Sequence, residues 1–124
     1  MPELLFKVET HKIIGICMEV HRILGKGFLE IVYKDAIEYE CNSRKYEYER
    51  EKEFTIHYKH IILSHKFYAD FTLFNKIILE VKSCNGIVDK FVARTLNYLA
   101  ASKLKVGLIV NFGKDSLEWK RLIV

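Results

Sequence analysis

The fold is decided by the stretch Tyr68–Lys82, which reads YADFTLFNKIILEVK. Two runs in it, Tyr68–Leu73 and Ile77–Lys82, are rich in aromatic and β-branched residues and predict strands. Phe74-Asn75-Lys76 separates them and predicts a hairpin turn. The second run is apolar at nearly every position, so we expect a central strand that is covered on both faces.

Two acids and a lysine stand out in this apolar hairpin. Glu80 and Lys82 are two residues apart on a strand, so they share a face. A three-residue turn would pair Leu73 with Ile77 and set Asp70 opposite Glu80, whereas a two-residue turn would send Asp70 to the other face. Two close carboxylates beside a lysine suit Mg²⁺, which prefers one or two carboxylates with waters and phosphate oxygens. The alternative interpretation is a structural Glu80–Lys82 ion pair on a half-exposed strand.

The rest of the chain predicts an α/β domain with a mixed central β-sheet flanked by helices. Apolar residues at steps of three and four indicate helices, and alternating or continuous apolar runs indicate strands. The charged stretch Arg44–Glu53 is expected to be a solvated helix end and loop. The predicted elements are helices at Val8–Leu24, Phe28–Arg44 and Val88–Ser102, and further strands at Glu53–Tyr58, Lys105–Asn111 and Leu117–Val124.

Composition limits the class of protein. The 124 residues, half of them hydrophobic, fit one globular domain spanning 1–124. The net charge of +4 permits a nucleic-acid partner without indicating one. The three cysteines form no C-x-x-C pair, and no apolar run approaches the roughly 20 residues of a membrane span. We therefore expect a cytoplasmic protein that does not enter a membrane.

Several motifs resemble a known family. Asp70, separated by nine residues from Glu80-x-Lys82, is similar to the core motif of the PD-(D/E)XK nuclease superfamily. Gly27-Phe28-Leu29-Glu30-Ile31-Val32-Tyr33 resembles the signature of the GxxExxY protein family, a small branch of that superfamily. Further matches follow in the same order at Phe67–Phe71, Leu96–Leu99, Val106–Gly113 and Lys120–Val124. The resemblance therefore covers about His11 to Val124. The resemblance implies a restriction-endonuclease-like core.

The resemblance also implies a set of catalytic residues. Asp70 and Glu80, completed by Glu30 on the preceding helix, would bind Mg²⁺ or Mn²⁺, with a backbone carbonyl of Val81 as a further metal ligand. Lys82 would assist catalysis. The implied activity is that of a metal-dependent phosphodiesterase, a hydrolase acting on DNA.

Three further residues have supporting roles by resemblance. Related branches carry a glutamine and a tyrosine four residues apart on the helix after E-x-K. Tyr98 matches the tyrosine, but Arg94 stands where the glutamine is expected, and it could bind a phosphate or pair with Glu80. Tyr33 could orient Glu30 or stack on a base, and its alternative is plain core packing.

The departure at Arg94 leaves the activity open between different classes of function. The leading hypothesis is a Mg²⁺-dependent nuclease acting on DNA. The alternative is a catalytically altered module of the same fold that binds nucleic acid or a protein partner. A weaker alternative is a dimer that resolves Holliday junctions. The small size of the chain suggests that a homodimer or a protein partner contributes to substrate binding.

Overall fold

A computed structural model describes residues 5–124, so residues 1–4 of the predicted domain 1–124 lie outside the described residues. In chain order, its elements are α1 (Lys7–Leu24), α2 (Glu30–Arg44), β1 (Tyr48–Phe54), β2 (His57–Tyr58), β3 (Ile61–Ile62), β4 (Phe67–Leu73), β5 (Ile77–Lys82), α3 (Asp89–Ser102), β6 (Val106–Asn111) and β7 (Glu118–Ile123).

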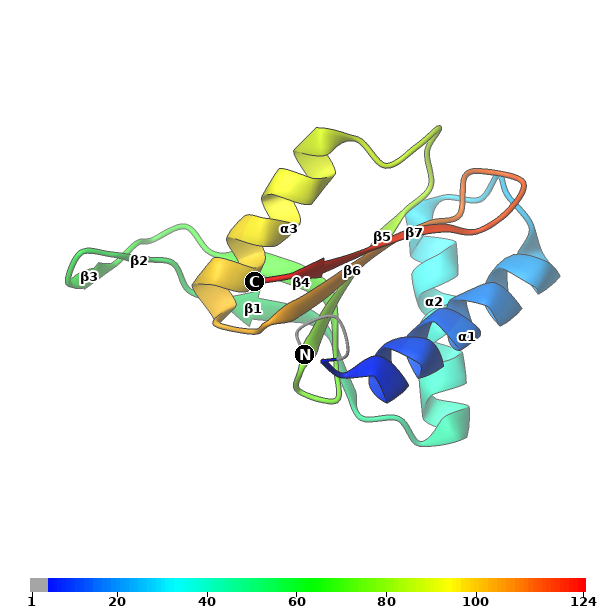
Figure 1. Ribbon diagram of the computed structural model, residues 1–124, viewed down its shortest axis with the longest axis horizontal. Helices are drawn as coiled ribbons and strands as arrows, with labels where there is room; N and C mark the ends of the chain where they lie inside the picture. The colour runs from blue at the N-terminus through cyan, green and yellow to red at the C-terminus, as the bar shows by residue number, and fades with distance from the viewer. Residues whose placement is uncertain (1–4) are drawn as a thin grey trace.

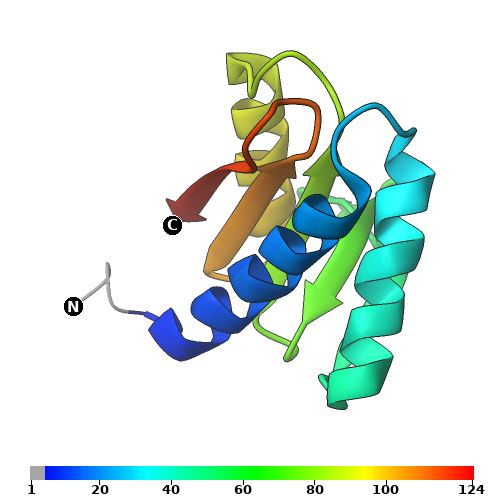
Figure 2. The ribbon, with the colours of Figure 1, turned by 90° about the vertical axis from the view of Figure 1, so that its right-hand side faces the viewer.

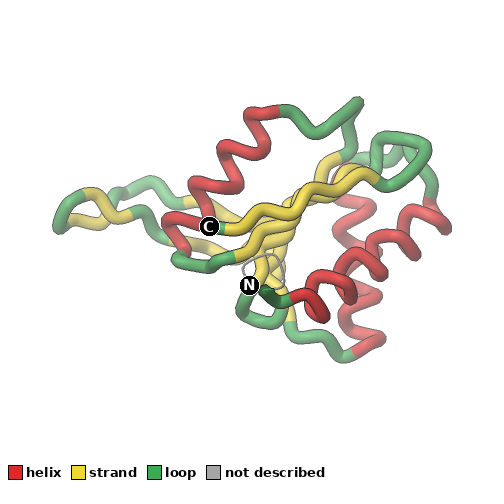
Figure 3. Tube along the Cα trace, viewed as in Figure 1, coloured by secondary structure: helices red, strands yellow, loops and turns green. Residues whose placement is uncertain are grey.

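Five of the strands form one mixed sheet in the order β1-β4-β5-β6-β7. All neighbours are antiparallel except β5 and β6, which run parallel and are joined through α3. Parallel neighbours need such a crossover connection, which places a helix on one face of the sheet. Figures 1 and 3 show α3 on one side of the strand layer and α1 and α2 on the other. The predicted mixed sheet flanked by helices is confirmed.

Each face of the sheet buries its own apolar cluster. The first cluster lies under α1 and α2, which cross over the sheet in Figure 2, and it includes Ile77, Leu79 and Val81 of β5. The second lies under α3 and includes Ile78 of β5 with Leu99 of α3. Because both faces of β5 are buried, an ionisable side chain on this strand is held away from bulk water.

The neighbouring strands β1 and β4 change the face that they bury at one point. Residues two apart on a regular strand share a face, yet Ala69 packs under α3 and Phe71 packs under α1 and α2. The change occurs at Asp70, which lies opposite Glu51, between the pairs Arg50–Phe71 and Lys52–Ala69. Glu51 has a left-handed backbone with φ 54°. The irregularity interrupts the pairing of β1 with β4 at two acidic residues, Glu51 and Asp70.

Two predictions about the elements are wrong. The stretch expected to be a solvated loop contains β1, the edge strand Tyr48–Phe54, and the strand predicted at Glu53–Tyr58 ends at Phe54. The three glutamates of β1 are exposed and alternate with half-buried residues, because this strand lies at the edge of the sheet. Short strands β2 and β3 then form a separate hairpin that extends away from the body in Figure 1.

The remaining boundaries agree with the prediction to within two residues. The second helix begins at Glu30 and not at Phe28, because the backbone N–H of Phe28 donates to the hydroxyl of Tyr33 at 3.2 Å in the loop before the helix. No helix between residues 5 and 124 combines the length and the apolar character needed to cross a membrane.

Candidate functional site: an acidic cluster with a buried lysine

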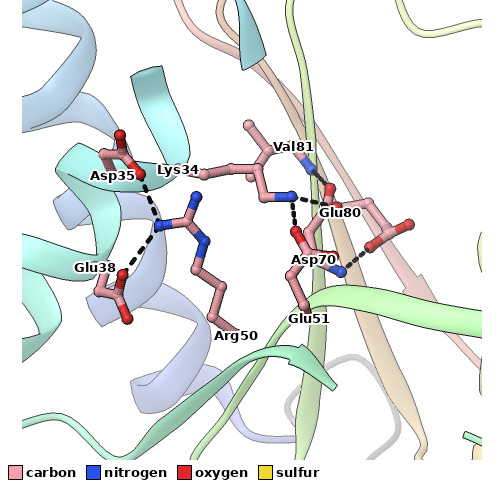
Figure 4. A network of polar contacts seen from close by, with 8 residues as sticks. All are labelled: Lys34, Asp35, Glu38, Arg50, Glu51, Asp70, Glu80 and Val81. Atoms are coloured by element: carbon pink, nitrogen blue, oxygen red, sulfur yellow. Dashed lines mark hydrogen bonds and ion pairs between the residues drawn. The ribbon is translucent and has the colours of Figure 1, made fainter. Parts of the chain in front are cut away.

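The β4–β5 hairpin brings Asp70 and Glu80 together. Leu73 pairs with Ile77 across the three-residue turn, as the convergence of the two acids requires. The ladder continues to Phe71–Leu79 and then gives way to side-chain contacts. The backbone N–H of Asp70 donates to Glu80 Oε2 at 2.8 Å, and the backbone N–H of Val81 donates to Asp70 Oδ2 at 2.8 Å. Each acid is therefore hydrogen-bonded to the backbone of the opposite strand (Figure 4).

The carboxyl of Glu80 has a raised pKa, which favours its protonated form. Its side chain is buried, with 6% of the residue exposed. Burial, followed by the nearby charge of Asp70, raises the pKa of Glu80 to about 8. Low polarity and a like charge both disfavour the ionised carboxylate. The pair is thus arranged so that a bound cation would favour loss of this proton.

Lys34 of α2 reaches the same cluster from the opposite layer. Its Nζ lies 3.1 Å from Asp70 Oδ1 and also donates to Glu51, while only 8% of the residue is exposed. Burial opposes the charge of Lys34, but its hydrogen bonds with Glu51 and Asp70 and their negative charges outweigh that effect and raise its pKa. Lys34 is therefore a buried ammonium between two carboxylates, as Figure 4 shows.

Sequence reasoning missed both Lys34 and Glu51. The signal for Lys34 was its position on the buried face of α2, three and seven residues before Ile37 and Cys41. A lysine in an apolar stripe needs a partner. Glu51 gave no signal, because its position depends on the irregular backbone of β1.

A second ion-pair group ties α2 to β1 beside this cluster. Arg50 binds Asp35 at 2.8 Å and Glu38 at 3.0 Å, both on α2. Figure 4 shows Arg50 next to the group of Lys34 but engaged with different carboxylates. The two groups together fix α2 against the irregular part of β1.

Lys82 and Tyr98 lie on the α3 side of the cluster. Lys82 Nζ is 4.4 Å from the centroid of the Phe91 ring on α3. The Tyr98 ring stacks on Phe67 with centroids 4.2 Å apart. Burial and the adjacent Glu80 carboxylate raise the pKa of Tyr98. Glu80 is thus accompanied by a cation and a phenol on the face that α3 covers.

Arg94 lies outside the cluster, in a groove along α3. It is exposed and lines this groove with Lys90, Asn97 and Tyr98, in a volume of about 560 Å³. No ion pair joins Arg94 to Glu80 in the part of the chain that the structure describes. Its guanidinium is therefore available to an anion that enters the groove.

Glu30 is the first residue of α2 and is exposed, one helical turn before Lys34. Residues four apart lie on the same face of a helix. The loop before Glu30 contacts the end of β5, because Ser83 Oγ donates to the carbonyl of Phe28 at 2.8 Å. Glu30 thus lies on the side of the fold where β5 ends. Within residues 5–124, it is not hydrogen-bonded to Asp70 or Glu80.

Tyr33 is fully buried and supports the loop that leads into α2. Its hydroxyl donates to the carbonyl of Gly25 at 2.6 Å, and its ring stacks on Phe112 with centroids 4.4 Å apart. A ring with 0% exposure is not open to a base. The structure thus shows the core packing that was the alternative interpretation of this residue.

The segment after Lys82 is held by a buried amide. Asn111 Oδ1 accepts hydrogen bonds from the backbone N–H groups of Cys84 and Gly113, both at 3.0 Å. Its Nδ2 donates to the carbonyl of Cys84 and to Glu118, also at 3.0 Å. The ends of β5 and β6 are therefore locked together next to the cluster.

The donor set of the cluster suits a hard divalent cation. Asp70 and Glu80 offer the one or two carboxylates through which Mg²⁺ is usually bound, and burial and the charge of Asp70 raise the pKa of Glu80. No three His, Cys, Asp or Glu side chains among residues 5–124 are grouped to hold a metal ion. Water or substrate oxygens would have to complete the coordination.

Comparison with known proteins gives a family. The model of the PD-(D/E)XK nuclease superfamily matches residues 7–122. A solved structure entitled "Crystal structure of SSO0001" is similar in fold, with a TM-score of 0.56 and 16% sequence identity over 74% of this chain. This chain corresponds to about half of that structure, 48% of its length. No curated protein matches the sequence.

Proposed function

This chain belongs to the PD-(D/E)XK nuclease superfamily, and on that premise we propose that it is a Mg²⁺-dependent nuclease that hydrolyses phosphodiester bonds in DNA. The observation that carries the proposal is the convergence of Asp70 and Glu80, each hydrogen-bonded to the backbone of the opposite strand, where burial and the charge of Asp70 raise the pKa of Glu80. The motif at residues 27–33 supports placing the chain in the GxxExxY branch.

The residues of the cluster would have different roles in the reaction. Asp70 and Glu80 would hold the cation, with the backbone carbonyl of Val81 and with Glu30 at the edge of the site. The divalent cation supplies the positive charge that polarises the phosphodiester and activates the attacking water. Lys82, which is held over the ring of Phe91, would stabilise charge that develops on the phosphate.

The groove along α3 supports a role for Arg94 and Tyr98 in substrate binding. Tyr98 lines it, and the nearby charge of Glu80 is one cause of the raised pKa of Tyr98, so the groove adjoins the acidic cluster. Exposed Lys90 and Arg94 line it. Guanidinium and ammonium groups bind phosphate oxygens, so we expect these residues to contact phosphates next to the one that reacts.

The test is metal-dependent cleavage of single-stranded and double-stranded DNA. Asp70→Ala and Lys82→Ala should each lower the rate by about 10²-fold or more, because each removes a group that stabilises the transition state. Lys26→Ala is the matched control, since Lys26 pairs with Asp115 at an exposed position. Cleavage that continues unchanged in both site variants, or that needs no divalent cation, would remove the proposal.

A second function is favoured by the cation that already faces Asp70 and by the residue at position 94. Lys34 is paired with Asp70, and Arg94 stands where related branches carry glutamine. These features suit a protein that binds nucleic acid or a partner without cleaving it. In that case, purified protein would show no cleavage with Mg²⁺ or Mn²⁺, while Arg94→Ala would still weaken its binding to DNA.

A further inference from the structure

Lys34 is unusual among the lysines of this protein because its charge is buried. Only 8% of the residue is exposed, and the side chain extends from α2 toward β1 and β4. A buried ammonium is costly unless negative groups surround it. Its two partners, Glu51 and Asp70, supply that compensation from neighbouring strands.

The two partners of Lys34, Glu51 and Asp70, differ in their other contacts. Asp70 is the acid that we assign to the metal, and its Oδ2 already accepts the backbone N–H of Val81 at 2.8 Å. Its other oxygen, Oδ1, is the one that Lys34 holds at 3.1 Å. A cation approaching Asp70 therefore meets the oxygen that an ammonium occupies.

Glu51 is the second partner of Lys34, and its backbone conformation is unusual. Its left-handed backbone, with φ 54°, is rarely adopted by residues other than glycine. It lies opposite Asp70, between the ladder pairs on either side. Non-glycine residues in such conformations gather at functional sites, where their surroundings hold them. The conformation accompanies a direct contact between the carboxylate of Glu51 and Lys34.

We propose that Lys34 is the resident counter-ion of the acidic cluster, and that a divalent cation entering the site displaces its ammonium from Asp70 while Glu51 retains it. This inference rests on the proposed function, since it takes Asp70 as a metal ligand. Lys34 is a positioning residue in this account: it keeps the acids assembled before the metal arrives and lowers the affinity of the site for the metal.

The test is calorimetric titration of metal-free protein with Mn²⁺ at 0.15 M salt, where exposed charges more than about 8 Å apart are largely screened. The informative variant is the double substitution Lys34→Met/Glu51→Gln, which removes the ion pair without changing the net charge. Competition between two ligands for one site couples their affinities, typically by about 5–150-fold. We expect the double variant to bind Mn²⁺ at least about fivefold more tightly than the unaltered chain.

Lys34→Met alone should also bind Mn²⁺ more tightly, and Arg50→Met is its matched control. Arg50 lies beside Lys34, and its removal changes the net charge equally, but its partners are Asp35 and Glu38. Arg50→Met should therefore leave the affinity for Mn²⁺ nearly unchanged. Equal gains in Lys34→Met and Arg50→Met would indicate a general charge effect and would overturn the inference.

The inference and the proposed function can fail separately. If Asp70→Ala abolishes Mn²⁺ binding while the double variant binds as the unaltered chain does, the metal site stands and the role of Lys34 is refuted. If Asp70→Ala binds Mn²⁺ as tightly as the unaltered chain, the proposed metal site itself is refuted, and the inference falls with it. Circular dichroism of each variant establishes that it is folded, and the double variant keeps the test valid if Lys34→Met alone does not fold.

Discussion

At the scale of single residues, the cluster joins one buried ammonium to two carboxylates. Asp70 and Glu51 share the ammonium of Lys34, and the raised pKa of Glu80 favours its uncharged form. Removing one partner of a buried ion pair lowers the stability of a protein by more than the intact pair contributes to it, because the other charge is left uncompensated. The cluster is therefore sensitive to pH and to substitution.

The proton on Glu80 predicts a pH-dependent stability. The pKa of Glu80 is about 8 in the folded protein against 4.5 as its ordinary value, so the folded state binds more protons between these values. Its contribution to stability is fully present below about pH 4.5 and is lost as the pH rises to about 8, on the order of a few kcal/mol. Urea unfolding in the presence of a chelator should show Glu80→Gln losing less stability than the unaltered chain between pH 5 and pH 8. Parallel losses in the two proteins would show that Glu80 is ionised in the fold.

Substitution of Tyr33 tests its supporting role. Tyr33→Phe leaves the carbonyl of Gly25 and the N–H of Phe28 without their partner and should cost about 1–2 kcal/mol in the free energy of unfolding. Tyr39→Phe is the control on the same helix, because Tyr39 is 69% exposed, and it should change stability by less than about 0.5 kcal/mol. Equal effects in chemical denaturation would mean that the buried hydroxyl does not support the loop.

The sequence predicts part of this site and not the rest. Asp70, Glu80 and Lys82 were found because the alternation of a hairpin relates its residues by simple register, and the turn length in the structure agrees. Lys34 joins them through the packing of α2 on the sheet, and Glu51 through a left-handed backbone. The apolar stripe of α2 marks Lys34 as buried but does not name its partners, and no local pattern marks Glu51.

At the scale of elements, the site depends on how strand ends are joined. Asn111 at the end of β6 holds the segment that follows Lys82. Gly113 allows this close approach, because a Cβ there would lie 2.2 Å from the carbonyl oxygen of Cys84. The position of Lys82 is therefore linked to the β6–β7 turn.

The close approach at Gly113 gives a matched pair of substitutions. Gly113→Ala should destabilise the protein by about 1–3 kcal/mol or more, because backbone atoms must move to relieve the overlap. A Cβ on Gly86, in the same segment after β5, would meet nothing within 4 Å, so Gly86→Ala should change stability by less than about 0.5 kcal/mol. Thermal unfolding of both variants is the measurement. A Gly113→Ala protein as stable as Gly86→Ala would contradict the described packing.

The apolar periodicity of each element explains whether the sequence identifies it. The helices and β4 to β7 have clear apolar periodicity, and their bounds agree with the prediction. Strand β1 was missed because its exposed face carries charges, which outnumber the half-buried Tyr48 and Phe54. An edge strand gains its order from pairing with β4, and that pairing is not a local property of its sequence.

At the scale of the whole molecule, the cluster lies between the two layers of helices. Lys34 approaches from α2 on one face of the sheet, whereas Lys82 packs against α3, which carries Tyr98, on the other. This is possible because β1 and β4 change the face that they bury at Glu51 and Asp70. The irregular point of the sheet is thus the point where groups from both layers meet.

The β2–β3 hairpin is outside this arrangement and should be removable. It extends from the body in Figure 1, and its tyrosine and isoleucines are exposed. The N–H of Leu63 already donates to the carbonyl of Ile56 at 2.9 Å, so an Asn-Gly turn can replace residues 57–62. We expect the melting temperature to change by less than about 3 °C, because no apolar cluster loses a member. A large loss of stability in a thermal scan would show that the hairpin belongs to the folded core.

The central claim is that Asp70 and Glu80 form a site for a divalent cation. Anomalous diffraction from crystals soaked in Mn²⁺ tests it most directly. The account predicts a manganese peak between the two carboxylates, with Lys34 Nζ moved away from Asp70 Oδ1 and still in contact with Glu51. A cluster without a peak, with Lys34 still bound to Asp70 while manganese occupies another part of the molecule, would contradict it.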